Sequence, residues 1–427
     1  MTPENPSHSS SLLWLSTYRH ALVWLVAANF FGIVLAIQLL WPEIQWPTWF
    51  SYGRVMPVHM NGQLYGWLAL PLIALLLDWT LPSPSHKAFQ PLLLLWSAVL
   101  GWAAIAWLSG RVSGKLFLDW TPPWALTFAF VIYVFWCQML RICFQRGSSW
   151  SQSQRQQAFW GLLLSAPVGA LLVWASRPTV YPAINPQSGG ATGTALLGSS
   201  LSVVFILFAV LRLQQMRQPD LQVKWRSLLA FLGCHLIYFA LLKHGHSGNG
   251  DIFQQTGLFS LFTWPLLLRT PLGSISTSPV LRRWYRAMGF WALLLILNGA
   301  MLFLPGWLDR AKFSNLLVAH AHLAMAGLAT SIVIYMACLL GGKPLQSIFK
   351  NRIVFWVWHS STLLMCLVLS WAGWKAFREP GAFYEGASWV QAVYGMRLFC
   401  GLLMLGAAIH YCWQSFAQED NHEASLG

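Results

Sequence analysis

Charged side chains are scarce in this sequence. Lysine, arginine, aspartate and glutamate make up 9% of the 427 residues, whereas a soluble protein carries about 25%. Hydrophobic residues make up 56%. This balance excludes a soluble globular protein. It predicts an all-α integral membrane protein whose apolar runs cross the lipid bilayer as helices.

Cysteine motifs are also missing. The seven cysteines almost all fall within apolar runs, and none forms a CxxC pair. This spacing gives no sign of a zinc site or of a disulfide framework. The chain also has no CxxCH motif, so it cannot attach a c-type haem of its own.

Apolar runs of adequate length recur along the whole chain, since a helix needs about 20 residues to cross a bilayer. They predict a bundle of about twelve transmembrane helices in one membrane domain, residues 20–414, between polar tails at 1–19 and 415–427. The predicted spans cover residues 20–41, 56–79, 90–108, 122–144, 158–176, 194–214, 226–243, 252–269, 285–304, 313–340, 352–372 and 389–414. No soluble domain fits between them.

The net charge of +14 does not indicate a nucleic-acid partner, because the basic residues lie between apolar runs and form no single patch. Most of them fall on the side of the bilayer that holds both termini, and the positive-inside rule then places both termini in the cytoplasm. The opening MTPENPSHSS lacks the basic region of a cleaved signal peptide. We therefore expect the first span to stay in the membrane.

The stretch VAHAHLAMAG, residues 318–327, places His320 and His322 inside a long apolar run. Ionisable groups at that depth are costly and usually functional. Two residues at i and i+2 lie about 200° apart on a helix, so these histidines cannot ligate one metal together. They can serve two different sites. The alternative is that both take part only in helix packing.

A third histidine, His59, lies a few residues into the second span. The second and tenth spans both enter the bilayer from the side opposite the termini. At about 1.5 Å per residue, His59, His320 and His322 fall at similar depth in the outer half of the membrane. This agreement favours a ligand shared between His59 and one histidine of the tenth span.

Two segments carry a resemblance. GRVMPVHMNGQLYGW and LVAHAHLAMAGLATS resemble the second and tenth helices of subunit I of the haem-copper oxidase superfamily, closest to cbb-type cytochrome c oxidases and nitric oxide reductases. The resemblance implies that His59 and His322 are the axial ligands of a low-spin haem b. It implies that His320 is the proximal ligand of a second, high-spin haem, and that Arg54 binds a haem propionate.

The copper site of that family is missing. It needs one histidine from the sixth helix and an adjacent pair from the seventh, but the sixth span here has no histidine and the seventh has no adjacent pair. His244 and His246, in KHGHSGNGD, could hold a second metal with a loop ligand such as Asp251. Stray histidines in a glycine-rich loop are the commoner case. We therefore expect one haem b, or two, without copper.

By this resemblance the chain is an oxidoreductase subunit in a bacterial inner membrane that carries electrons to oxygen or nitric oxide. Its electron donor would be a c-type cytochrome or a cupredoxin-bearing subunit. Two alternatives stay open. One is a haem or metal protein of the nitric oxide response, without turnover. The other is a twelve-helix transporter, although the sequence shows none of the internal repeats typical of transporters.

Overall fold

The computed structural model describes residues 8–82, 84–184, 278–302, 304 and 306–423. The regular elements in these ranges are helices. Alone or in series, these helices form nine stretches in the described residues that are long and apolar enough to cross a membrane, and the nine stretches coincide with nine of the predicted spans. The predicted spans 194–214, 226–243 and 252–269 lie outside the described residues. The chain is therefore a many-span helical membrane protein, and the count of twelve stays a prediction.

Five spans precede residue 185. They are built from α1 (His8–Leu40), α2 (Tyr52–Asn61), the π-helical η2 (Gly62–Leu68), α3 (Ala69–Thr80), α4 (His86–Leu108), α5 (Pro122–Arg146), α6 (Gln152–Ser165) and α7 (Val168–Ser176). The short 3-10 helices η1 (Thr48–Phe50) and η3 (Gly147–Ser149) lie in connections. The second span consists of α2, η2 and α3 in series. The fifth is interrupted between α6 and α7 at Pro167, which has no amide hydrogen to donate.

Four spans follow residue 277. Their elements, with the short helices beside them, are α12 (Pro279–Leu302), α13 (Trp307–Ala311), α14 (Asn315–His322), the π-helical η5 (Leu323–Ala329), α15 (Thr330–Leu340), α16 (Gly342–Ile348), α17 (Arg352–Arg378) and α18 (Ser388–Glu423). The span with the histidine pair consists of α14, η5 and α15 in series. The second span and this one therefore share one design, in which a π-helical turn interrupts an α-helix.

Helix α1 begins at His8 and α18 ends at Glu423, so each extends into a segment that the sequence predicts as a tail. Trp14 and Tyr18 explain the extension at the start of the chain. Both side chains are fully buried in the bundle, and the Tyr18 hydroxyl donates a hydrogen bond to the Val333 carbonyl of α15. Buried aromatic packing, which a span count does not consider, holds these residues in the helix.

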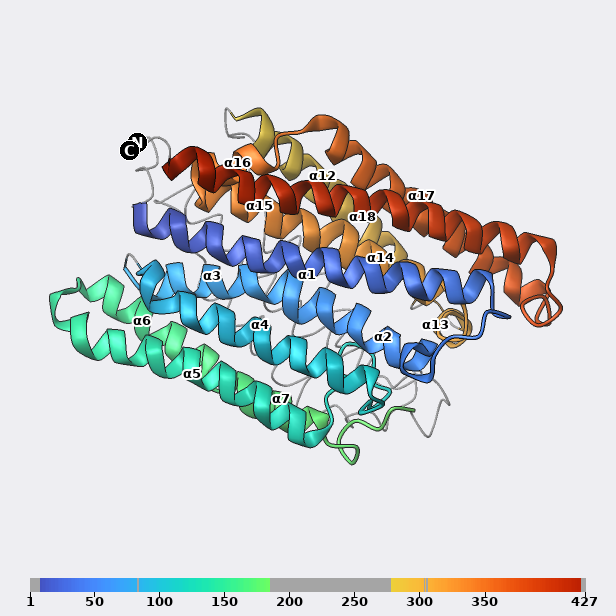
Figure 1. Cartoon of the computed structure of the whole chain (residues 1–427), viewed down its shortest axis with the longest axis horizontal. Coiled ribbons are helices and arrows are strands. Elements are labelled where there is room, and N and C mark those ends of the chain that lie inside the picture. Colours follow the sequence, from blue (N-terminus) through green and yellow to red (C-terminus); the bar gives the residue numbers. More distant parts are fainter. Residues whose placement is uncertain (1–7, 83, 185–277, 303, 305, 424–427) are drawn as a thin grey trace.

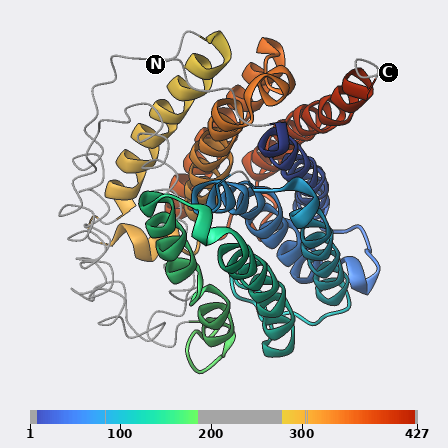
Figure 2. The same cartoon turned by 90° about the vertical axis from the view of Figure 1, so that its left-hand side faces the viewer.

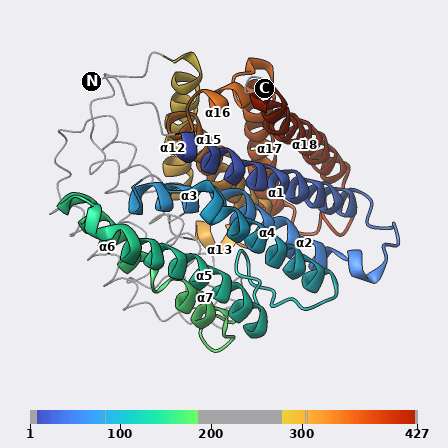
Figure 3. The same ribbon diagram turned by 60° about the vertical axis from the view of Figure 1, so that its left-hand side comes forward.

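Helix α1 occupies a central position. It packs against α18 on one side and against α2, η2, α3 and α4 on the other. Seen from the end where α1 begins, α5, α6 and α7 form one flank, and α17 and α18 lie on the opposite flank (Figure 2). Figure 3 shows α1 between the α5–α7 side and the α12–α16 side. The first described turn of α1 and the last of α18 lie at the same end of the bundle (Figure 1).

Candidate functional site

His59 is held by α1. Its Nδ1 lies 2.7 Å from the Ala28 carbonyl oxygen of that helix. The ring rests on Gly32, one helical turn further on, where a Cβ atom would come within 2.8 Å of the His59 Cε1. Gly32 therefore provides the space that lets the imidazole reach a backbone carbonyl of a neighbouring helix.

His322 and His320 are held by different partners. The His322 Nδ1 lies 2.8 Å from the Val318 carbonyl oxygen, one turn earlier in the same helix. The His320 Nδ1 lies 2.7 Å from Oδ1 of Asn298 in α12, and the His320 ring faces Gly299 beside it. Asn298 is a polar residue within an apolar span, and its amide oxygen fixes the orientation of the His320 ring.

All three imidazoles share one protonation pattern. Because an amide oxygen can only accept a hydrogen bond, Nδ1 is the nitrogen that carries the proton in each neutral ring. The Nε2 atom of each ring then keeps its lone pair. A hydrogen bond from the second nitrogen to a carbonyl is the usual arrangement around metal-bound histidines. His59, His320 and His322 are therefore each in the tautomer whose unprotonated nitrogen is Nε2.

His359 of α17 shows the opposite pattern. Its Nδ1 accepts a hydrogen bond of 2.9 Å from the Trp291 indole, a group that can only donate. The proton of the neutral ring is then on Nε2. The ring packs among Trp284, Trp291 and Phe355. These contacts describe a packed core histidine. His410, on α18, packs beside Tyr411.

Arg397 of α18 places a positive charge near this site. It lies within electrostatic range of both His59 and His322, and these two histidines also interact with each other. Arg397 has no such effect on His320, whose ring turns toward α12. His59 and His322 therefore lie within electrostatic range of each other, while the His320 ring lies against Asn298 of α12. The part of the chain that the structure describes contributes no carboxylate partner to Arg397.

A π-helical segment follows each histidine-bearing helix. η2 begins three residues after His59, and η5 begins directly after His322. In each segment a tryptophan ring packs onto a glycine. A Cβ atom on Gly66 would lie 2.4 Å from the Trp24 side chain, and one on Gly327 would lie 2.6 Å from Trp291. π-turns of this kind occur frequently at functional sites.

Tryptophan side chains from other helices donate hydrogen bonds to backbone carbonyls in both π-helical segments. The Trp96 indole donates to the Tyr65 carbonyl of η2 at 2.9 Å, and the Trp358 indole donates to the Ala326 carbonyl of η5 at 3.0 Å. Trp67 joins the two spans through a 3.0 Å hydrogen bond to the Thr330 hydroxyl. The Trp67 bond links the two histidine-bearing spans directly, inside the bundle, where water cannot replace it.

Arg54 lies at the start of α2, against the end of α4. Its Nη1 is 3.4 Å from the Leu108 carbonyl oxygen, and its guanidinium contacts Gly110. The predicted role of Arg54 toward a haem propionate stays a prediction. His244, His246 and Asp251 lie outside the described residues. Within the described ranges, no cluster of three or more histidine, cysteine or acidic residues is arranged for a metal ion.

Lys115 lies in the connection between α4 and α5 and attaches it to the end of α7. Its side chain is buried, and Nζ donates to the carbonyls of Ala175 and Ser176 at the end of α7, at 3.2 and 2.6 Å. Burial lowers the pKa of Lys115 to about 8, although the neighbouring Asp119 carboxylate acts in the opposite direction. Burial also raises the pKa of Asp119, opposed by the amides of Ser113 and Gly114.

We expect Lys115→Met to change how stability depends on pH. Between pH 8 and 10.5 the folded protein holds fewer protons on Lys115 than the unfolded chain does, so stability rises with pH in this window. The difference in Tm between the wild type and Lys115→Met should therefore grow from pH 7.5 to pH 9.5 in thermal melts. If the difference in Tm shrinks over this range, only the charged form of the Lys115 amine bonds to the carbonyls at the end of α7.

Comparison with known proteins finds relatives that align with nearly the whole chain. No family model matches the chain. The chain is 21% identical to a cytochrome c oxidase subunit 1 homolog of Azorhizobium caulinodans, over 93% of this chain and 80% of the relative. The homologs of Agrobacterium tumefaciens and of the Bradyrhizobium diazoefficiens bacteroid are also 21% identical, over 90% and 95% of this chain and 79% and 81% of the relatives. The chain is thus a distant relative, over nearly its full length, of cytochrome c oxidase subunit 1 homologs.

Proposed function

We propose that this chain is a haem-binding membrane subunit of the cytochrome c oxidase subunit 1 kind, with a haem b between His59 and His322. The observation that carries the proposal is the shared protonation pattern of these two rings. Both Nδ1 atoms bond to backbone carbonyls, which leaves two Nε2 lone pairs on helices whose histidines interact. Histidine is a common axial ligand of haem iron.

The residues around the two histidines fit this cofactor. The carbonyls of Ala28 and Val318 orient the imidazoles and raise their basicity as ligands. Arg397 supplies positive charge beside both rings, and a haem brings two propionates that need such charge. A haem b with two histidine ligands supplies one-electron transfer. In this proposal Arg54 binds a propionate near the end of the bundle.

His320 would hold a second haem on the other face of the same helix. Asn298 orients its ring toward α12. The second haem would be the place where oxygen or nitric oxide receives electrons, while copper is not expected. A metal at His244 and His246 remains a separate hypothesis.

The electron donor would be a separate protein with a c-type haem or a cupredoxin centre, since this chain has no CxxCH motif. We place the protein in a bacterial inner membrane with both termini in the cytoplasm, from the distribution of basic residues between the spans. The common end of α1 and α18 supports an even number of spans.

A reduced-minus-oxidised spectrum of the purified protein tests the proposal, with a pyridine haemochrome assay and copper analysis on the same sample. We expect one or two b-type haems per chain and no copper. One copper per chain would contradict the expected loss of the copper site. A preparation without any haem would overturn the proposal and leave the transporter as the better hypothesis.

A further inference from the structure

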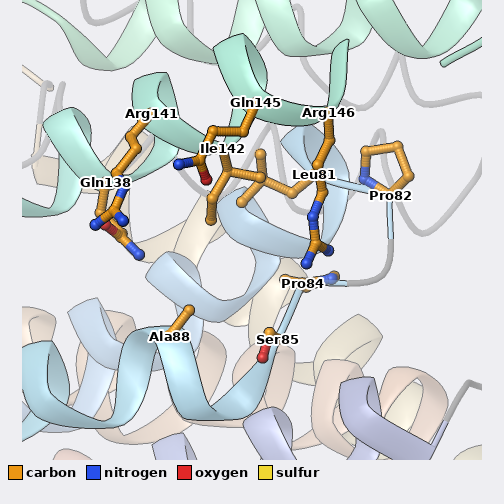
Figure 4. Close-up of a pocket in the computed structure, with 10 residues that line it drawn as sticks. All are labelled: Leu81, Pro82, Pro84, Ser85, Ala88, Gln138, Arg141, Ile142, Gln145 and Arg146. Atoms are coloured by element: carbon orange, nitrogen blue, oxygen red, sulfur yellow. The ribbon is translucent and has the colours of Figure 1, made fainter. Parts of the chain in front are cut away.

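A cationic cavity opens at the end of the bundle where α3 ends, α4 begins and α5 ends. Its volume is about 220 Å³. It is lined by Leu81, Pro82, Pro84, Ser85, Ala88, Gln138, Arg141, Ile142, Gln145 and Arg146 (Figure 4). No acidic residue is among them. The lining thus combines two guanidinium groups, two amides and one hydroxyl, all able to donate hydrogen bonds.

The two arginines have no anionic partner in the described part of the chain. Figure 4 shows Arg146 extending from α5 toward Pro84 and Ser85, while Gln145 points into the space between Arg141 and Arg146. Ser85 stands at the N-cap of α4 and makes no capping bond with its side chain. Arg146 lies beside Ser85 and Arg141 lies beside Gln138 (Figure 4), so donors on both sides of the cavity can bind an oxyanion with several acceptor atoms, such as a phosphate group.

The apolar face of α5 indicates what carries this phosphate. Leu126, Phe130, Cys137 and Phe144 are exposed along α5, and their spacing places them on the same side of the helix as Arg141. Phe144 is 82% exposed between the two arginines. In a membrane, this face lies against acyl chains, and Arg141 connects it to the cavity that Arg141 also lines.

We propose that this cavity binds the phosphate of an anionic phospholipid whose acyl chain lies along the exposed face of α5. Helix α5 is 25 residues long, or about 37 Å, which exceeds the hydrocarbon thickness of about 30 Å. Arg141 and Arg146, in its last turns, therefore lie at the level of the headgroups. Basic pockets between transmembrane helices are a known mode of lipid recognition.

The full-length protein, purified in a non-ionic detergent and stripped of lipid, provides the test. Short-chain phosphatidylglycerol is titrated against the wild type and against Arg141→Gln/Arg146→Gln, and binding is followed by the shift in Tm. Each arginine contributes about fivefold to affinity, so the double variant should bind about 30-fold more weakly. Arg155→Gln, an exposed arginine of α6 outside the cavity, should bind like the wild type.

Titrations with two other compounds distinguish an anionic lipid from other ligands of the cavity. Phosphatidylcholine and glycerol 3-phosphate should give no saturable shift in Tm. Saturable binding of glycerol 3-phosphate that is lost in the double variant would identify a soluble phosphate ligand and overturn the proposal. Equal binding of phosphatidylcholine, or equal binding by the double variant, would overturn it as well. The single variants Arg141→Gln and Arg146→Gln, each expected to lose about fivefold, decide the matter if the double variant does not fold.

Discussion

His59→Ala and His322→Ala should each abolish the low-spin haem spectrum of the purified protein. Each substitution removes one of the two Nε2 atoms that the proposal assigns to the haem iron. The remaining imidazole would leave the iron with one protein ligand, which changes its spin state or releases the haem. Optical spectra of the reduced and oxidised forms, with a haemochrome assay for content, measure both effects.

Two other intramembrane histidines serve as matched controls. His359 has its proton on Nε2 because its Nδ1 accepts from Trp291, and His410 packs beside Tyr411 on α18. His359→Ala and His410→Ala should keep the low-spin spectrum, although the loss of the Trp291 bond should lower the Tm of the first. If all four variants keep the same spectrum, the ligands of any bound haem lie elsewhere in the chain.

Span positions were accessible from the sequence because they depend on a local property. An apolar run of sufficient length must become a helix in a bilayer, whatever it packs against. Nine predicted spans therefore agree with helices of the structure to within a few residues at most ends. The start of α1 departs further, because Trp14 and Tyr18 belong to the packed bundle although they precede the predicted first span.

The division of the histidine pair was also accessible, since it follows from helix geometry alone. Which neighbour each ring meets was not. Arg397 and Asn298 are visible as polar residues within apolar spans, and such residues are functional candidates by default. Their partners depend on how α12 and α18 pack against α14, which no local pattern encodes. The sequence alone therefore does not predict that Arg397 acts on His322 or that Asn298 holds His320.

The π-turns gave no signal in the sequence. A π-turn inserts a residue into a helix, and its cost is offset by side chains that bind the displaced carbonyls. Here those side chains include Trp96 and Trp358, which come from other helices. The glycines under Trp24 and Trp291 are likewise recognisable only once the helices are packed. Both features depend on contacts between distant segments of the chain.

Gly32 contacts the His59 ring directly, but nothing in the sequence distinguishes it among the 33 glycines of the chain. A Cβ atom at this position would come within 2.8 Å of Cε1 and 2.9 Å of Nδ1 of His59. Real Cβ contacts are not this short, so Gly32→Ala must push the ring away from the Ala28 carbonyl. We expect a displaced His59, a mixed-spin or shifted haem spectrum, and a stability loss of about 1–3 kcal/mol from overpacking.

Gly299→Ala is the control for this effect. A Cβ atom there would lie 3.9 Å from the His320 ring, which is an ordinary van der Waals contact, so the spectrum of the haem between His59 and His322 should stay unchanged. Redox titrations and low-temperature spectra of both variants separate a moved ligand from general destabilisation, because only a moved ligand changes the spectrum of the protein that remains folded. An unaltered spectrum in Gly32→Ala would show that the contact between His59 and α1 does not control the iron, and the ligand role of His59 would then rest on His59→Ala alone.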